Sequence, residues 1–173
     1  MDIKLRSLKN QDKTYFFSWL RDQDVIRYSL SIFQNMKTHE DISLWFDNIL
    51  LDNSTYNKAI FDNSTGNLIG YAGICNLSKT NLSGEYFIFI GDKDYHNKGI
   101  GTYVTKEIIK YGFENLNLNR IMLTVSNENI GAVKAYTKAN FKQEGVMRQA
   151  SYRDGKFHDK IIMGILKDEW KNN

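Results

Sequence analysis

The stretch Asp92-Lys-Asp-Tyr-His-Asn-Lys-Gly-Ile-Gly-Thr102 decides the fold that we expect for this chain. The run before it, Gly84–Gly91, is rich in aromatic and β-branched residues and predicts a buried strand. After it, apolar residues recur at spacings of three and four, which predicts a helix over about 99–114. The stretch is therefore a loop that joins the end of a strand to the start of a helix.

This loop has the composition of a phosphate site. Gly99 and Gly101 carry no Cβ, so their backbone can approach a ligand closely. The first N–H groups of a helix have no intrahelical partner, and the helix dipole favours negative charge there. With Lys98 nearby, these groups suit phosphate oxygens, although a tight turn without a ligand fits the glycines equally well. The chain contains neither Gly-x-x-x-x-Gly-Lys-Ser/Thr nor Gly-x-Gly-x-x-Gly, so nucleotide-triphosphate and dinucleotide folds are not expected.

Three ordered motifs give the chain a resemblance to a known family. The segment His96–Gly101 resembles the Arg/Gln-x-x-Gly-x-Gly/Ala signature with which GNAT acetyltransferases hold the pyrophosphate of acetyl-CoA. Ile90–Tyr95 and the tail Glu144–Met163 resemble the branch that acetylates ribosomal-protein N-termini, amino sugars and related amines. Asn129–Tyr136 resembles the second family motif, an Asn followed by a Tyr at seven residues.

The resemblance covers nearly the whole chain and departs from the family pattern at two positions. His96 stands where Arg or Gln is usual, and Asn140 stands where Gly is usual. Asn tolerates the left-handed backbone conformation better than most residues, so the second departure is mild. The resemblance implies a mixed α/β fold with a central, mostly antiparallel sheet, in which a splayed parallel strand pair holds acetyl-CoA.

Sequence patterns predict the remaining elements of one N-acetyltransferase domain over 1–173. A Thr38–Asp41 capping box opens a helix with Trp45 and Phe46 on its core face. A helix that connects the strand ending at Ile90 to the one containing Ile121 makes these two strands parallel. The predicted strands are 3–8, 56–61, 68–76, 84–91, 120–125, 141–148 and 161–166; the predicted helices begin near residues 12, 25, 38, 99 and 129, and 29–37 is predicted as loop.

Composition narrows the class of protein. The net charge is +3 over 173 residues and no basic run occurs, so a nucleic-acid partner is not expected. Cys75 is the only cysteine, which excludes an intramolecular disulfide, and no residue spacing suggests a metal site. The N-terminus is polar and no stretch approaches about 18 apolar residues, so we expect no membrane partner and a cytoplasmic location.

Acetyl transfer needs a held cofactor, a neutral amine, charge stabilisation and a proton for the leaving thiolate. By resemblance, Tyr136 gives that proton and Asn129 contacts the cofactor or orients the helix; a tyrosine that only packs is the alternative. Glu85 is expected to accept the proton of the amine, and a plain surface carboxylate at the strand end is an equally good interpretation.

The resemblance also implies how acetyl-CoA is held. The pantetheine arm is expected to pair with the backbone near Phe89 and Ile90, much like an added strand. The expected diphosphate contacts are His96, Asn97, Lys98, Gly99, Ile100, Gly101 and Thr102.

The acceptor amine is where the sequence leaves alternatives open. Phe17–Asp22 resembles the opening helix of amino-sugar acetyltransferases of the pseudaminic acid type, which favours a nucleotide-linked amino sugar. A protein N-terminus or a polyamine is the alternative, and Asp22 with Asp24 is a thin acidic patch for the latter. A non-catalytic acetyl-CoA-binding module and a homodimer also stay open. The residues expected to bind the acceptor are Trp19, Arg27, Tyr28 and Tyr152.

Overall fold

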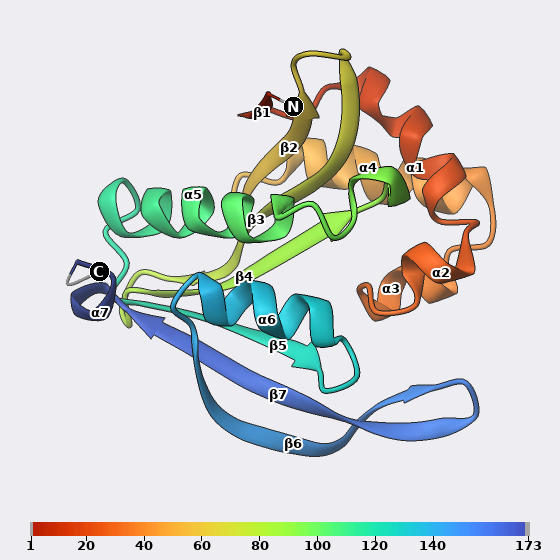
Figure 1. Cartoon of the computed structure of the whole chain (residues 1–173). Coiled ribbons are helices and arrows are strands. Elements are labelled where there is room, and N and C mark those ends of the chain that lie inside the picture. Colours follow the sequence, from red (N-terminus) through yellow and green to blue (C-terminus); the bar gives the residue numbers. More distant parts are fainter. Residues whose placement is uncertain (1, 172–173) are drawn as a thin grey trace. The chain divides into compact units, whose positions relative to one another are not determined.

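The computed structural model describes residues 2–171, whose helices and strands are labelled in Figure 1. These residues form two compact units. The first unit runs up to Gly73 and includes Ile88–Ile100. The second unit comprises Ile74–Phe87 and the residues from Gly101 onward. The chain thus crosses from one unit to the other within two strands and again at the start of the helix that follows the glycine loop. That 1–173 forms a single domain stays a prediction.

The elements occur in the predicted order, with two short helices that were not predicted, over residues 31–35 and 167–171. The strands are β1 Ile3–Arg6, β2 Tyr56–Asp62, β3 Asn67–Ser78, β4 Ser83–Ile90, β5 Arg120–Ser126, β6 Lys142–Arg153 and β7 Lys156–Leu166. The α-helices are α1 Lys13–Trp19, α2 Gln23–Ile26, α3 Ser31–Asn35, α4 His39–Leu51, α5 Ile100–Glu114, α6 Ile130–Lys138 and α7 Lys167–Lys171. Two 3₁₀ turns, η1 Asn10–Asp12 and η2 Lys93–Tyr95, complete the described elements.

The strands form one sheet in the order β1-β2-β3-β4-β5-β7-β6. The pairs β1–β2, β5–β7 and β6–β7 are antiparallel, whereas β4 and β5 are parallel, as the crossover through α5 predicts. Pairing of β4 with β5 covers only Ser83–Glu85 against Arg120–Met122, while β5 pairs with β7 along its whole length. The mostly antiparallel sheet with one parallel pair confirms the expected fold class.

Two local predictions were wrong in detail. The predicted loop over 29–37 contains helix α3, because Phe33 is fully buried against the rings of Trp45 and Phe89. Burial of one large side chain stabilises a helix too short to show a periodic pattern. The last two strands are also longer than predicted, since a two-residue turn at Asp154 and Gly155, both with positive φ, keeps them paired up to Arg153 and Lys156.

An aromatic cluster forms the core of the first unit. The ring of Phe16, on α1, is fully buried and lies 5.1–5.6 Å from the rings of Trp19, Trp45, Phe46 and Tyr71. The Thr38–Asp41 capping box is present in both directions, which fixes the start of α4 and so the placement of its two core aromatics. This cluster supports the segment Ile88–Ile90 of β4 through Phe89.

The second unit packs α5 against the sheet. Its core comprises the buried side chains Ile74, Val104, Ile108, Ile109, Phe113, Ile121, Leu123, Met163 and Ile165. Gly112 permits this contact, because a Cβ there would lie 2.7 Å from the side chains of Ile74 and Ile121. Helix α5 therefore packs closely on β3 and β5 at Gly112.

Candidate functional site

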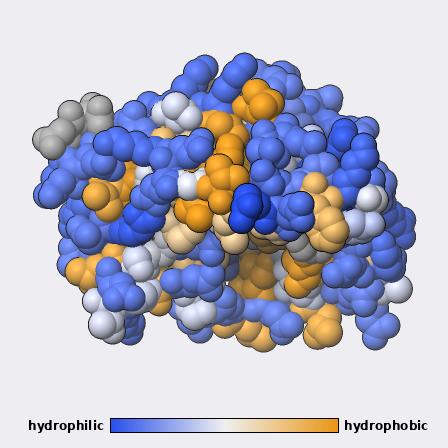
Figure 2. All heavy atoms as spheres, turned by 90° about the horizontal axis from the view of Figure 1, so that it is seen from below, coloured by the Kyte–Doolittle hydropathy of each residue, from blue (hydrophilic) through white to orange (hydrophobic). Residues whose placement is uncertain are grey.

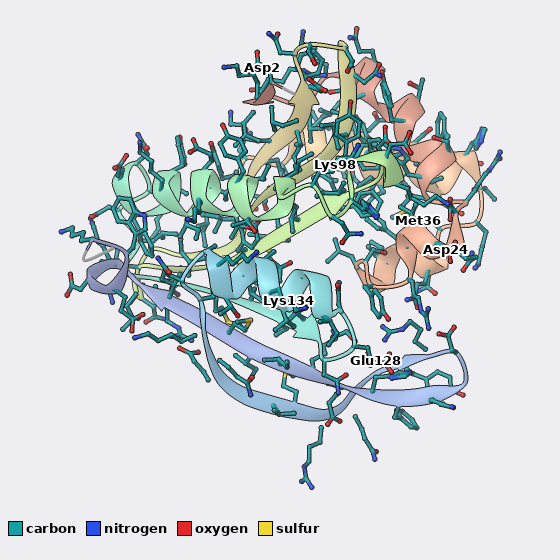
Figure 3. All side chains as sticks on the ribbon, in the orientation of Figure 1. Asp2, Asp24, Met36, Lys98, Glu128 and Lys134 are labelled. Atoms are coloured by element: carbon teal, nitrogen blue, oxygen red, sulfur yellow. The ribbon has the colours of Figure 1, made fainter. Side chains whose placement is uncertain are left out.

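The glycine loop has a backbone shaped for an anion. Asn97 and Gly99 both adopt positive φ, 59° and 79°, on either side of Lys98, and α5 begins at Ile100 (Figure 3). Alternating left-handed residues turn successive N–H groups toward one side and make an anion-binding concavity. The first amides of the 15-residue α5 extend that concavity. The loop is exposed, and a Cβ at Gly99 would meet no atom within 4 Å, so a ligand has room there.

His96 fastens this loop to the end of β4. Its Nε2 lies 2.9 Å from the carbonyl oxygen of Ile90. Because a carbonyl only accepts, Nε2 is the nitrogen that carries the proton, and Nδ1 of the neutral ring is then an acceptor. The geometry gives His96 a role in placing the loop, and a direct contact from His96 to phosphate stays a prediction.

A second anchor ties the loop to the turn between β2 and β3. The hydroxyl of Tyr95 donates to Asp62 Oδ2 at 3.0 Å, and Lys98 Nζ lies 5.8 Å from the centre of the Tyr95 ring. Asp62 is 3% exposed and also accepts from the hydroxyl and amide of Ser64 at 2.6 and 3.0 Å. The Ser64 hydroxyl is the largest of the causes that lower the pKa of Asp62 from 3.8 to about 2, against burial, which raises it.

Asp62→Asn is expected to lower the Tm at pH 7 and to leave it nearly unchanged near pH 2. The folded-state pKa of Asp62 is depressed, so its stabilisation is fully present above pH 3.8 and is lost as the pH falls toward 2. Thermal unfolding of both proteins between pH 7 and pH 2 measures this. Tyr95→Phe removes one donor and should reproduce only part of the effect; a Tm difference independent of pH would contradict the assignment.

The end of β4 approaches β3 unusually closely. A Cβ at Gly70 would lie 2.0 Å from the carbonyl oxygen of Phe89, so only glycine allows this approach. The carbonyl of Ile69 accepts from the amides of both Gly91 and Asp92, at 2.9 and 3.2 Å, which marks a bulge. The backbone at Phe89 and Ile90, which is expected to pair with pantetheine, is thereby bent out of regular pairing.

A shallow hollow of about 370 Å³ opens beside this bulge in the first unit. Its apolar wall is Trp19, which packs so tightly on Gly91 that a Cβ there would lie 2.0 Å from the indole ring. Its acidic wall combines Asp22 with Asp92 and Asp94 from the loop. The remaining lining residues are Ser18, Val25 and Lys93.

The carboxylates of this hollow already hold one alkylammonium group. Lys93 Nζ lies 2.5 Å from Asp22 Oδ2. That hydrogen bond, with the charges of Asp22, Asp24 and Asp94, raises the pKa of Lys93, and the same bond lowers the pKa of Asp22. Three carboxylates, Asp22, Asp92 and Asp94, line the hollow together with this one ammonium, so the wall is negative in a chain whose net charge is +3.

The other residues predicted to bind the acceptor lie elsewhere. Arg27 stacks its guanidinium 5.5 Å from the ring centre of Tyr28, and neither lines the hollow. Tyr152, in the second unit, is 62% exposed and pairs with Phe157 at 4.9 Å between ring centres. Of the four residues, only Trp19 lines the acidic hollow.

Tyr136 lies in α6, in the second unit, and is 9% exposed. Its ring packs edge-on against Tyr86 and Phe141, with ring centres 6.0 and 6.1 Å apart. Burial raises the pKa of Tyr136 well above its usual value, so the hydroxyl keeps its proton across the neutral and mildly basic pH range. This is the protonation state that a proton donor needs.

Asn129 caps the start of α6, which agrees with its predicted role of orienting this helix. Its other predicted role, a contact with the cofactor, stays a prediction. Its side-chain oxygen accepts from the amide of Ala132 at 3.1 Å and caps the helix. Asn140, after the helix, has a φ of 69°, which confirms that it takes the left-handed conformation of the usual glycine. Glu128, just before the cap, pairs with Arg153 and His158 of the β6–β7 hairpin at 3.0 and 3.1 Å.

Glu85 is half-buried on β4, in register with Met122 of β5. Its carboxylate oxygen Oε2 accepts a hydrogen bond at 2.9 Å from the amide of Asn76 on β3. The residue is therefore held by a partner, which distinguishes it from a freely moving surface carboxylate.

Some features of the described residues bear on ligands and partners without defining a site. Within 2–171 no group of three or more His, Cys, Asp or Glu side chains is arranged to hold a metal ion. In the same range, no helix is both long and apolar enough to cross a membrane. Apolar areas interrupt the polar surface shown in Figure 2. Exposed apolar side chains of β6 and β7, the edge hairpin of the sheet, are Val146, Met147, Tyr152, Phe157 and Leu166.

Several residues of this site escaped the sequence reasoning. The acidic wall gains Asp92 and Asp94, which flank Lys93 inside the very stretch that predicted the loop. Their alternation with Lys93 was the available signal, but only the fold brings Asp22 beside them. Asn76 and Asp62 lie in separate strands, and nothing in the linear sequence relates them to Glu85 and Tyr95.

Comparison with known proteins agrees with this geometry. Residues 2–142 match the family model described as an acetyltransferase (GNAT) domain. The chain is 26% identical over 168 residues to the spermidine N(1)-acetyltransferase of Escherichia coli, covering 97% of this chain and 88% of that protein. It is 35% identical over 108 residues to the putative ribosomal N-acetyltransferase YdaF of Bacillus subtilis, covering 61% and 57% of the two chains.

A solved structure shares the fold over the full length. The spermidine N-acetyltransferase from Vibrio cholerae, in complex with CoA and spermine, superposes with a TM-score of 0.88 at 23% identity. The match covers 99% of both chains.

Proposed function

The chain belongs to the GNAT acetyltransferase family, and we propose that it transfers the acetyl group of acetyl-CoA to a primary amine of a linear polyamine. N-acetyltransferase activity follows from the family. The polyamine is the finer inference, and the observation that carries it is the acidic hollow beside the end of β4, lined by Asp22, Asp92, Asp94 and Trp19.

A polyamine suits this hollow for electrostatic reasons. It presents several ammonium groups on a flexible apolar chain, so it needs carboxylates next to an apolar wall. The Lys93 ammonium, an alkylammonium on a four-carbon stem, is held by these same carboxylates. A nucleotide-linked amino sugar, which the sequence favoured, brings two or more negative phosphates and would be repelled from this wall. Relatives named for spermidine also favour the polyamine over the sugar.

Acetyl-CoA fits the loop residues as the acyl donor. The left-handed Asn97 and Gly99 and the amides at the start of α5 suit its diphosphate, and Lys98 adds a positive charge. The nitrogen of the amine attacks the thioester carbon, and the carbon–sulfur bond then breaks. We assign Tyr136 to give its proton to the departing thiolate and Glu85 to take the proton of the nitrogen as the carbon–nitrogen bond forms.

The acceptor is tested by measuring coenzyme A release with spermidine, spermine, an N-terminal peptide and a UDP-linked 4-amino sugar. Turnover with the polyamines alone is the expected result. Turnover with the peptide or the sugar alone would overturn the polyamine and keep the acetyltransferase. Binding of acetyl-CoA without release on any amine would favour a non-catalytic module.

Asp94→Asn is expected to raise the KM for spermidine about fivefold, because one partly exposed charge pair contributes on the order of 1 kcal/mol. The KM for acetyl-CoA should not rise, since the variant removes a negative charge near the phosphate loop. Asp52→Asn, in the exposed turn after α4, changes the net charge equally and is the control. Equal effects of the two variants on the KM for spermidine would contradict a polyamine in the hollow.

Three further expectations are kept as proposals. The first is the branch of the family. The tail resembles the branch that acetylates ribosomal proteins and amino sugars, whereas the acidic hollow favours a polyamine acceptor, as in the relative named for spermidine. A homodimer through the edge hairpin is supported by the exposed Tyr152 and Phe157, at 62% and 64%. A cytoplasmic location is consistent with acetyl-CoA as the donor.

A further inference from the structure

Strand β3 contains a bulge opposite Glu85. In a regular strand, residues three apart point to opposite faces. Here Ile74 and Leu77 both face Gly84, since a Cβ on Gly84 would lie 2.4 Å from Ile74 Cγ2 and 3.0 Å from Leu77 Cδ2. The alternation is therefore interrupted between them, at Cys75 and Asn76.

The two bulge residues both reach Glu85. Cys75 Sγ lies 3.4 Å from the carbonyl oxygen of Glu85, and Asn76 Nδ2 lies 2.9 Å from its carboxylate oxygen Oε2. Asn76 has a φ of 51°, a left-handed conformation that asparagine tolerates better than most residues. Bulges often redirect a side chain next to an active site.

We propose that Asn76 is a positioning residue for the acetyl transfer: the bulge aims its amide at Glu85 so that the carboxylate is fixed in one plane. This inference rests on the proposed role of Glu85 as the base. Among residues 2–171 the carboxylate has no other hydrogen-bond or ion-pair partner. Oε1 is thus the oxygen that receives the proton of the attacking nitrogen.

The proton balance explains why a held carboxylate matters. An ordinary carboxylate is too weak a base to deprotonate a free alkylammonium. The amine therefore attacks in its neutral form, after its ammonium proton has passed to solvent. The attacking nitrogen becomes acidic as its bond to the thioester carbon forms, and its second proton then passes to Oε1 of Glu85. The thiolate that leaves takes the Tyr136 proton, and exchange with solvent afterwards removes the proton from Glu85 and returns one to Tyr136. Because Oε1 is already fixed, the carboxylate does not have to reorient before it accepts the proton of the attacking nitrogen.

Other titratable groups around Glu85 are already engaged. The Cys75 thiol on β3 faces the Glu85 backbone carbonyl rather than its carboxylate. Arg120, which opens β5, is held by both carboxylate oxygens of Glu144 on β6. The neighbour of Glu85 in register on β5, Met122, is uncharged. Asn76 is thus the group that sets the hydrogen bonding of the carboxylate.

A ¹³C NMR spectrum of the glutamate carboxyls at pH 7, with the Glu85 signal assigned by its absence in Glu85→Gln, tests the contact without relying on activity. Asn76→Gly retains positive φ and removes the amide, and should move the Glu85 carboxyl signal. Asn76→Asp replaces the donor with a like charge and should move this signal as well. Asn117→Gly, another left-handed asparagine, is the control and should leave it unchanged.

Kinetics then separate this inference from the function on which it rests. Asn76→Gly should lower kcat about fivefold with an unchanged KM for acetyl-CoA, and should have no further effect in a Glu85→Gln background. An unchanged Glu85 carboxyl signal in both Asn76 variants overturns the inference. So does an unchanged kcat in Asn76→Gly when Glu85→Gln is strongly impaired. Wild-type kcat in Glu85→Gln rejects the base itself, and the positioning role falls with it, while coenzyme A release still establishes the acetyltransferase.

Discussion

Tyr136→Phe will lower kcat about a hundredfold or more and leave the Kd for acetyl-CoA nearly unchanged, because loss of a positioned proton donor typically costs 10²–10⁴-fold. The phenyl ring fills the same space against Tyr86 and Phe141, so the packing of α6 is preserved. Burial keeps the hydroxyl protonated through the basic range, so the wild-type kcat should show no loss at high pH from ionisation of this tyrosine. Steady-state kinetics and calorimetric binding of acetyl-CoA measure both parts.

Tyr86→Phe is the matched control for that variant. It also removes a buried tyrosine hydroxyl, one that lies 2.9 Å from Thr105 Oγ1. We expect a loss of stability from the missing buried hydrogen bond, although Thr105 Oγ1 still donates to the carbonyl of Gly101 at 2.6 Å, and a kcat within a few-fold of wild type. If Tyr136→Phe and Tyr86→Phe lowered kcat equally, Tyr136 would be a packed tyrosine and not the proton donor.

Gly99→Asp will weaken acetyl-CoA binding about a hundredfold, which corresponds to ~2.7 kcal/mol. Gly99 has a φ of 79°, a conformation that disfavours any L side chain by about 1–2 kcal/mol. The loop of the variant should therefore leave the conformation in which its amides can bind one phosphate group together. The added carboxylate also repels the diphosphate. A Cβ at this position meets no protein atom within 4 Å, so the fold itself should tolerate the change.

Two variants separate the causes of that loss. Gly99→Asn adds a side chain of similar size without charge and suits positive φ better, so it should recover most of the affinity. Gly66→Asp introduces the same charge at the same φ of 79°, also without a neighbour within 4 Å, in the turn between β2 and β3. Its Kd for acetyl-CoA should match wild type. An unchanged Kd in Gly99→Asp would reject the phosphate loop.

Local patterns predicted the elements that carry their own signal. The capping box of α4, the parallel pair across α5 and the left-handed Asn140 all follow from residues close together in the sequence. Helix α3 did not, because its reason is the burial of Phe33 against aromatic rings from α4 and β4. The full length of β6 and β7 was missed as well, since cross-strand pairing extends beyond the apolar stretches that were used to find them.

For the site, the sequence by itself determined the glycine loop, the tyrosine of α6 and the glutamate of β4, because each lies within a contiguous motif. Only the tertiary structure decided what surrounds them. It turned His96 toward the carbonyl of Ile90, brought Asp22 beside Asp92 and Asp94, and placed the amide of Asn76 on Glu85. A motif fixes local conformation through dihedral preferences and capping, whereas charge clusters and positioning contacts depend on strand register and bulges, which are set by packing between segments far apart in the chain.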